Sequence, residues 1–219
     1  MTTHSANQAS DAVTFLHADA SLLVVCKPAG LLSVPGRGAD KQDCVASRVQ
    51  AAYSDALVVH RLDMATSGLM LFARGSEVQR RLSMAFEQRH IHKRYMAVVH
   101  GAVLHDTGEI NLPLLTDWPN RPLQKVDFAQ GKASLTRYTV ITRDLAQNSS
   151  RVLLEPVTGR SHQLRVHLRE LGHPIWGDAL YAPPSVLGLS PRLLLHASAL
   201  WLSHPATDEA LHFDSAPPF

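Results

Sequence analysis

The sequence predicts an α+β fold built on a mixed, mainly antiparallel central sheet with flanking helices. Short β-rich apolar runs are separated by turn residues, and three segments repeat apolar residues at helical spacing. A βαβ rhythm and a Gly-rich phosphate loop are both absent from the sequence, which argues against a nucleotide-binding fold. The 219 residues, 45% hydrophobic and 18% charged, have an ordinary globular composition and are enough to bury a core.

The bulk charge and the cysteines exclude several classes of protein. A net charge of +2 does not by itself indicate a nucleic-acid-binding protein, so any basic face must come from clustering. Cys26 and Cys44 form no paired motif, and nothing suggests a disulfide framework. The sequence has no apolar run of membrane-spanning length and no signal-peptide pattern in its first ten residues. We therefore expect a cytoplasmic protein.

The first part of the chain predicts an arm, a strand and a helix. Small polar residues at positions 1–12 predict a flexible arm, and residues 13–219 are expected to form a single domain. Residues 22–26 are a β-rich run that a Lys-Pro-Ala-Gly turn ends. Residues 42–53 carry apolar side chains at helical spacing and are expected to form the first helix.

The middle of the chain predicts a second helix and a central strand. Ser76 and Gln79 fit a capping box ahead of an apolar stripe, which predicts the start of the helix. Residues 93–99 are apolar on both faces, as is typical of a strand in the middle of a sheet. A shorter strand is expected at 108–112, and the proline-containing segment 114–125 is expected to be a long connection.

The last third predicts a hairpin, a third helix and a late core strand. Residues 134–141 and 151–155 are expected to pair as a hairpin. The Gly-Arg-Ser sequence at 159–161 is expected to open the third helix, which Gly172 ends as the residue just past its C-terminus. The apolar run 193–202 predicts a strand of the core.

One stretch combines charged side chains with buried flanks. Residues 60–68 have the sequence HRLDMATSG, and the apolar residues on both sides, 57–59 and 69–72, predict short buried strands. Arg61 and Asp63 lie between these two strands, and loops held by a rigid scaffold often carry function. We therefore do not expect this charge pair to be ordinary solvent-exposed surface. On the local pattern alone, Asp63 also fits a residue that caps a turn.

This stretch resembles the signature of the RluA-type pseudouridine synthases, in which the aspartate is the catalytic residue. Residues 27–30 (KPAG), 93–97 (KRYMA) and 159–165 (GRSHQLR) resemble further motifs of that family in the same order. Four ordered motifs are a specific signal that extends to about residue 181, and residues 191–196 also look similar. The resemblance implies the pseudouridine synthase catalytic fold, without the N-terminal S4-like domain of larger members. It also implies an RNA-modifying isomerase that needs no metal and no organic cofactor.

The resemblance also implies a substrate. The short chain and residues 117–122 (DWPNRP) resemble the dual-specificity member of the family. This likeness implies uridines in 23S rRNA and in the tRNA anticodon stem-loop, reached by base flipping. RNA is therefore the expected partner of a monomeric protein that does not bind membranes. Other members modify other uridines, so the same chemistry on a different rRNA or tRNA site stays open as an alternative.

Three residues are candidates for the chemistry. Pseudouridine formation breaks the glycosidic bond of a uridine, turns the base and rejoins it through carbon, and one carboxylate nucleophile suffices. The resemblance assigns this role to Asp63, with attack at the ribose C1′ or the uracil C6. Arg165 is the candidate cation that keeps the carboxylate charged, although Arg165 and Arg169 also fit an exposed helical pair. Tyr95 is the candidate ring on which the flipped uracil stacks, or else a core tyrosine.

Five further residues are candidates for RNA contact: Arg61, Leu164, Trp118, Arg121 and Lys125. Arg61 would fill the gap that a flipped base leaves, or else contact a phosphate or form a structural ion pair. Leu164 would form the other wall of the uracil site, or else belong to the core. The other three would hold the RNA through its phosphates, unless segment 114–125 is an ordinary surface loop.

Three other functions are weaker interpretations. Thirteen histidines prompt a hydrolytic metalloenzyme, but no metal-ligand spacing occurs, and His162 and His167 are five apart and fit one helical face poorly. A non-enzymatic RNA-binding module would explain the basic residues and Tyr95 but leaves Asp63 without a role. A two-carboxylate glycosidase lacks any marked partner acid.

Overall fold

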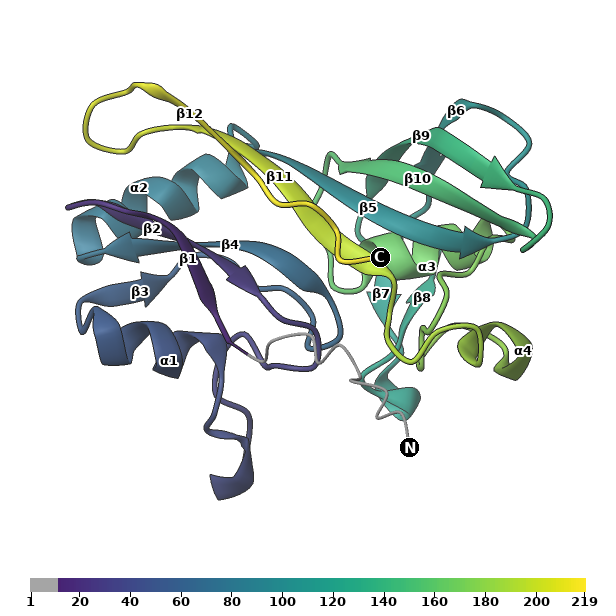
Figure 1. Ribbon diagram of the computed structural model, residues 1–219, viewed down its shortest axis with the longest axis horizontal. Coiled ribbons are helices and arrows are strands. Elements are labelled where there is room, and N and C mark those ends of the chain that lie inside the picture. The colour runs from purple at the N-terminus through teal and green to yellow at the C-terminus, as the bar shows by residue number, and fades with distance from the viewer. Residues whose placement is uncertain (1–11) are drawn as a thin grey trace, which may run out of the picture.

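The structure is a computed structural model that describes residues 12–219 (Figure 1). The strands are β1 Thr14–Ala18, β2 Leu22–Lys27, β3 Ala56–Val58, β4 Ser67–Arg74, β5 His92–His100, β6 Thr107–Asn111, β7 Leu114–Thr116, β8 Gln124–Val126, β9 Leu135–Asp144, β10 Ser149–Pro156, β11 Leu195–Ser203 and β12 Ala210–Asp214. The helices are α1 Val45–Ala52, α2 Ser76–Glu87, α3 Gln163–Glu170 and α4 Pro184–Leu187, with 3-10 helices η1 Ala39–Lys41 and η2 Trp118–Asn120. The arm expected at 1–12 lies, apart from its last residue, outside the described residues.

One ten-stranded sheet organises the described chain. Its order is β1-β2-β4-β11-β5-β10-β9-β6, with β12 beside β11 and β3 beside β4. The pairing of β4 with β11 is parallel, and the other pairings of this sheet are antiparallel. Figure 1 shows β5 and β11 running between one half with α1 and α2 and another half with α3. The predicted α+β class with a mainly antiparallel sheet is therefore confirmed.

A close backbone approach joins the two halves at the last residue of the HRLDMATSG stretch. Gly68 pairs with Ala197 where β4 meets β11. Gly68 has φ of 113°, and a Cβ at this position would lie 2.3 Å from the Ala197 carbonyl oxygen. Only glycine fits such a contact, because it lacks the Cβ and tolerates positive φ. The loop that precedes β4 is thereby fixed beside the central strands.

The buried side chains form clusters under different helices. Val45 and Val49 of α1 pack with β2 and β4 on one side of the sheet, and Leu82 of α2 packs in a second cluster with other residues of these strands. Leu164 and Leu168 of α3 pack against β5 and β10. Tyr95 touches both the α1 cluster and the α3 cluster. A tyrosine at this junction is held by two parts of the core.

Two predicted helix starts are wrong. The capping box at Ser76 does not form, because α2 has Gly75 as its N-cap with no side-chain cap, and the Gln79 side chain donates to the Val58 carbonyl instead. The third helix begins at Gln163 rather than at residues 159–161, which belong to the preceding loop. The predicted end is correct, since Gly172 with φ of 89° lies just past α3.

Segment 114–125, which the sequence predicted to be a long connection, is mostly regular structure. It forms most of an antiparallel hairpin, β7 with β8, with η2 between the strands. The hairpin is ordered because Leu114 is buried with Val166 and Tyr181, and Leu123 packs against them. The strands expected at 22–26, 93–99 and 193–202 and the hairpin of β9 with β10 are present.

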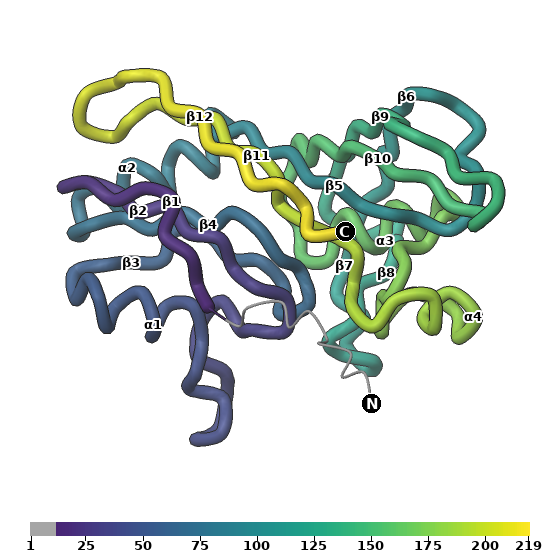
Figure 2. Tube along the Cα trace, in the orientation of Figure 1, coloured from purple at the N-terminus to yellow at the C-terminus, as the bar shows by residue number. Residues whose placement is uncertain are grey.

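The end of the chain returns to the middle of the molecule. Figure 2 shows the segment after β12 running back alongside β11 toward the centre, where the Ser215 amide donates to the Ser198 carbonyl. In the part of the chain that the structure describes, no helix has the length and apolar character needed to cross a membrane.

Candidate active site

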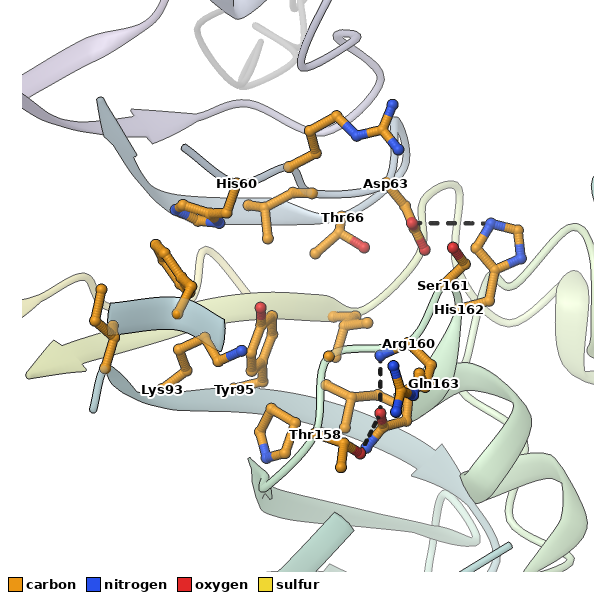
Figure 3. Close-up of a pocket in the computed structure, with 18 of the residues that line it drawn as sticks. His60, Asp63, Thr66, Lys93, Tyr95, Thr158, Arg160, Ser161, His162 and Gln163 are labelled. Carbon is orange, nitrogen blue, oxygen red and sulfur yellow. Dashed lines mark hydrogen bonds and ion pairs between the residues drawn. The ribbon is translucent and has the colours of Figure 1, made fainter. Parts of the chain in front are cut away.

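A cleft of 1490 Å³ opens between the two halves of the sheet. Three segments line most of it: the loop 59–66, the first residues of β5, and residues 156–165, which run from the end of β10 into the start of α3. Figure 3 shows Asp63 on one wall, with Tyr95 and the loop before Gln163 on the other. The HRLDMATSG, KRYMA and GRSHQLR stretches, far apart in the sequence, therefore meet at one site.

The charged centre of the cleft consists of Asp63, Arg165 and Asp178. The Arg165 Nη1 donates to Asp63 Oδ2 at 3.2 Å. The other edge of the guanidinium donates twice to Asp178, from Nε at 2.9 Å and from Nη2 at 2.6 Å. A bidentate pair of this kind fixes the plane of an arginine. Asp178 thus orients Arg165 so that its remaining nitrogen faces Asp63.

Burial differs sharply among these three side chains. Arg165 and Asp178 are 4% and 1% exposed, whereas Asp63 is 28% exposed and faces the cleft. Burial acts to lower the pKa of Arg165, but its bonds to Asp178 and the charge of Asp63 outweigh it, and the pKa is raised. The arginine therefore stays cationic in a nearly dry position, and the alternative of an exposed Arg165–Arg169 pair is wrong.

The loop that carries Asp63 is tied down on both sides of the aspartate. Ser33 Oγ accepts from the Leu62 amide and donates to the Leu62 carbonyl. The buried Lys27 ammonium donates to the carbonyls of Met64 and Pro28 at 2.8 Å each. The Thr66 amide bonds the Asp63 carbonyl, not its carboxylate. The carboxylate is consequently not a turn cap, and it points toward Arg165.

The opposite loop is organised by Gln163. Its Oε1 accepts from Thr158 Oγ1 at 2.8 Å and from the Arg160 amide at 3.0 Å. Its Nε2 donates to the Leu135 carbonyl and to Thr136 Oγ1. These bonds, two of which Figure 3 marks, join the loop to β9 and place the start of α3 at the wall of the cleft.

His162 connects Asp63 to the β7–β8 hairpin. Its Nε2 lies 3.8 Å from Asp63 Oδ1, and its Nδ1 is 2.6 Å from the Tyr181 hydroxyl. The same hydroxyl accepts from the Gln124 amide of β8 at 2.9 Å. Because the Tyr181 hydroxyl oxygen already accepts from Gln124, its proton is best donated to His162 Nδ1. His162 then carries its own proton on Nε2, the nitrogen that faces Asp63. Burial lowers the pKa of His162, so the ring is neutral near pH 7.

Tyr95 and Leu164 both line the cleft. Tyr95 is partly buried, and burial together with the charge of Asp63 raises the pKa of its hydroxyl. Leu164 is 6% exposed and packs in the α3 cluster. Leu164 is therefore a core residue, as the alternative interpretation expected. It also lies at the cleft wall, so its contact with a base stays a prediction.

The predicted RNA-contact residues divide into two groups. Arg61 is exposed and lines the cleft beside Asp63. Trp118, Arg121 and Lys125 lie on the hairpin and do not line the cleft, although their neighbour Pro122 does. Trp118 is 64% exposed, with the Arg121 guanidinium 4.7 Å from its ring centre. The Lys125 ammonium lies 3.7 Å from Asp127.

Three residues of the site were not predicted from the sequence. Asp178 and Tyr181 were not identified as candidates, and His162 was not given a role at this site. Asp178 and Tyr181 follow Gly177 in a loop that lacks helical or strand periodicity, so no pattern marked them. His162 was considered only as a metal ligand. The signal that could have found Asp178 is chemical, because a buried arginine requires a carboxylate partner. Among residues 12–219, no three His, Cys, Asp or Glu side chains gather in a way that could hold a metal ion.

The fold and the cleft are those of an RNA-modifying enzyme class. The family model described as RNA pseudouridylate synthase matches residues 21–170, a span that includes Asp63, Tyr95 and Arg165. The chain belongs to this family and is an isomerase that acts on RNA.

Particular relatives are close in sequence. The chain is 50% identical over 204 residues to the dual-specificity RNA pseudouridine synthase RluA of Pasteurella multocida (strain Pm70), a match that covers 93% of each chain. It is 47% identical over 207 residues to the protein of the same name from Escherichia coli (strain K12), covering 94% of each. A solved structure, human RNA pseudouridylate synthase domain containing 1, matches with a TM-score of 0.80 and 27% identity over 95% of this chain and 85% of that one.

Proposed function

We propose that this protein converts specific uridines to pseudouridine in 23S rRNA and in the tRNA anticodon stem-loop. The observation that carries the proposal is the Asp63 carboxylate, partly exposed to the cleft and held 3.2 Å from the buried Arg165 guanidinium. The dual-specificity name of the relatives supports the two RNA targets.

The chemistry needs one nucleophile. Asp63 attacks the ribose C1′ or the uracil C6 of the flipped uridine and so loosens the bond between N1 and C1′. The base turns, C5 bonds to C1′, and the bond to Asp63 breaks so that the carboxylate is released. The proton on C5 leaves and N1 ends with a proton. Atoms and electrons balance within the uridine, so the proposed reaction requires no metal, organic cofactor or co-reactant. Arg165 binds and orients the Asp63 carboxylate in a site that the bound base closes to water.

Tyr95 and Leu164 hold the base in this proposal. A base pulled from a stem-loop loses its stacking partners, and an aromatic ring in the pocket replaces one of them. Tyr95 is suited to this because two parts of the core fix its ring beside the cleft. Its hydroxyl keeps its proton at neutral pH, since burial and Asp63 raise its pKa.

Arg61 and the β7–β8 hairpin bind the rest of the RNA. Arg61 is exposed at the cleft and lacks a charged or hydrogen-bonding partner among the described residues, so its planar cation is available for the gap in the RNA stack. Trp118 and Arg121 contact the stem-loop outside the cleft, and Lys125 adds a phosphate contact.

The experiment that tests the proposal maps pseudouridine in cellular rRNA and tRNA with and without the gene. We expect loss at one 23S rRNA uridine and at one anticodon stem-loop uridine, and recovery on expression of the wild-type chain. Loss at a different RNA position would keep the chemistry and replace the targets. An unchanged map, with no conversion by the purified protein, would favour a non-enzymatic RNA-binding module.

We further propose that the protein works in the cytoplasm as a monomer. Asp63, Arg165 and Asp178 come from one chain, so the site as described is complete without a second copy. Sedimentation of the active protein should give the mass of one chain, and a larger species that alone is active would contradict this proposal.

A further inference from the structure

Lys93 is a cleft residue that the chemistry described above does not use. It follows His92 at the start of β5, lines the cleft and lies partly buried. Figure 3 shows its side chain running beside Tyr95, with the nitrogen directed into the pocket. The side chain has a clear direction, and it ends in the space that the substrate would occupy.

The surroundings of the Lys93 ammonium are apolar or neutral. Its nitrogen lies 5.6 Å from the centre of the Phe86 ring, and that ring packs against His60 with centroids 4.7 Å apart. His60 accepts the Leu71 amide proton with Nε2, and burial followed by the charge of Lys93 lowers its pKa to about 3. This wall therefore supplies a weak cation–π contact and no counter-charge.

Within residues 12–219, the Lys93 ammonium has neither an ion pair nor a side-chain hydrogen bond. Its sequence neighbour Arg94 does have one, with Glu155 at 2.6 Å. Burial lowers the pKa of Lys93. A partly buried ammonium with three unused donors costs stability, and such a cost is typical of a group kept for a ligand.

Gly159 lies beside this ammonium, on the loop between β10 and α3. A Cβ added at Gly159 would lie 3.6 Å from the Lys93 nitrogen. Any larger side chain at residue 159 would occupy space beside the ammonium. The loop after β10 therefore passes close to the Lys93 ammonium, which lies in the cleft at the start of β5.

Lys93 and Tyr95 lie on the same face of β5, because side chains two apart in a strand share a face. Their Cα atoms are separated by about 7 Å, twice the rise of a strand. A phosphate of a nucleotide lies about one ribose away from its base, which is a similar distance. A uracil stacked on Tyr95 can consequently place a neighbouring phosphate at the ammonium.

We propose that Lys93 forms a binding site for one RNA phosphate next to the flipped uridine. The proposal rests on the proposed function, since it takes Tyr95 as the base platform. A phosphate supplies the full negative charge and several acceptor oxygens that the ammonium lacks in the protein. A uracil carbonyl is the rival ligand, and the experiment separates the two.

The experiment is a binding cycle in which one protein charge and one RNA charge are removed in turn. Both proteins carry Asp63→Asn, so the RNA stays unconverted, and one also carries Lys93→Met. The RNA is the stem-loop with the mapped target uridine, prepared with a single uncharged methylphosphonate at each neighbouring phosphate. Dissociation constants are measured by fluorescence anisotropy at several KCl concentrations.

We expect one methylphosphonate position to weaken RNA binding by about tenfold when Lys93 is present, because one charge-assisted contact is lost. In the Lys93→Met protein the same methylphosphonate should weaken binding by less than about twofold. The Lys93→Met protein should also show a salt dependence shallower by about 0.7 in log–log slope, the value for one phosphate on a single strand. The control is Lys41→Met, since Lys41 is exposed and does not line the cleft. That variant should keep the full methylphosphonate effect.

Melting temperature separates this role from a structural one. Removing an unpaired, partly buried charge should leave the melting temperature of Lys93→Met unchanged or raise it. A lower melting temperature together with equal losses at every methylphosphonate position would overturn the proposal. If Lys93→Met weakens binding without coupling to any phosphate, the ligand is the base and the proposal is wrong. If Lys93→Met does not fold, Lys93→Arg takes its place and must retain the phosphate coupling.

The outcome is distinguishable from failure of the proposed function. Binding is measured with a protein that performs no chemistry, so an absence of phosphate coupling bears on Lys93 alone. An absence of pseudouridine formation by the wild-type protein bears on the proposed function alone.

Discussion

The catalytic end of the cleft and the β7–β8 hairpin differ in how their side chains are held. Asp63 and Arg165 meet through a bond that joins the loop before β4 to α3, and Asp178 fixes Arg165 from another loop. At the hairpin, Trp118 is 64% exposed and its cation–π partner is Arg121 of the same hairpin. The chemical groups are thus held by contacts between distant parts of the chain, whereas Trp118 and Arg121 contact each other within one exposed hairpin. Substitutions at the two places should separate the rate of chemistry from the affinity for RNA.

Among these substitutions, Asp63→Asn should have the largest effect. It should lower the rate of the chemical step and leave RNA binding nearly unchanged. The amide keeps the size of the side chain but is not a nucleophile, so the single-turnover rate should fall by at least about 10³-fold. RNA affinity should change by less than about threefold. Asp55→Asn, at an exposed position that does not line the cleft, is the matched control and should be fully active. A rate within about tenfold of wild type would remove Asp63 from the mechanism.

Arg165→Met should lower both turnover and stability. Loss of the guanidinium leaves Asp178 buried without its partner, which costs about 3–5 kcal/mol of unfolding free energy. Turnover should fall by about 10²-fold or more because Asp63 loses its cation. In the double variant Arg165→Met/Asp178→Asn, urea unfolding should show stability partly restored while turnover stays low. Near-normal turnover in Arg165→Met would refute the ion pair as a requirement.

Acid should destabilise the region behind the catalytic loop. His196 is 1% exposed, bonds Ser67 at the start of β4, and burial followed by the charge of Arg192 lowers its pKa to about 4. In the unfolded chain it takes up a proton below about pH 6.5, but in the folded chain it does so only near pH 4. His196 should therefore lower the unfolding free energy by about 2 kcal/mol between pH 7 and pH 5, in addition to the contribution of buried His60.

The test of the acid effect is the pH dependence of urea unfolding. His196→Gln should make the curve between pH 7 and pH 5 less steep, with the remaining slope due to His60, whereas His105→Gln, at an exposed loop position, should leave it unchanged. A wild-type curve that is already flat in this window would show that His196 is not neutral in the fold.

Arg61→Ala should weaken RNA binding and base flipping by about tenfold. This effect is smaller than that expected at Asp63 and at least as large as those expected at the β7–β8 hairpin. Arg61 lies beside Asp63 but is exposed, so its loss should leave the fold intact. A fluorescent base analogue next to the target uridine reports flipping, and filter binding reports affinity. If the Arg61→Ala and Asp63→Asn proteins have the same RNA affinity and the same turnover, then Arg61 is not specific to binding and Asp63 is not specific to chemistry.

The hairpin substitutions should have the smallest effects. Trp118→Ala and Arg121→Ala should each raise the KM for RNA by about three- to tenfold with kcat within about twofold of wild type. Lys125→Met should have a smaller effect, since Lys125 already lies near Asp127. Steady-state kinetics at two salt concentrations measures these values. A fall in kcat with unchanged KM would mean that the hairpin acts on the catalytic groups through Tyr181 and His162.

The strands and the three family-like stretches of the cleft could be predicted from the sequence. Apolar runs marked β2, β5 and β11, and charged motifs placed Asp63 and Arg165 in one hypothetical site. Asp178 could not be predicted, because its pairing with Arg165 depends on a loop that shows no periodicity. The hairpin at 114–126 was missed because its order comes from burial of Leu114 against Tyr181, a contact between distant parts of the chain that local turn signals do not reveal. The start of α2 was misplaced since Gly75 replaces the expected side-chain cap.

A crystal structure of the Asp63→Asn protein bound to its stem-loop RNA tests the central claim most directly. We predict the target uridine turned out of the RNA, its base stacked on Tyr95, its C1′ or C6 next to residue 63, and the bonds between Arg165 and Asp178 unchanged. A uridine that stays stacked in the RNA, or that binds the hairpin with the cleft empty, would contradict it.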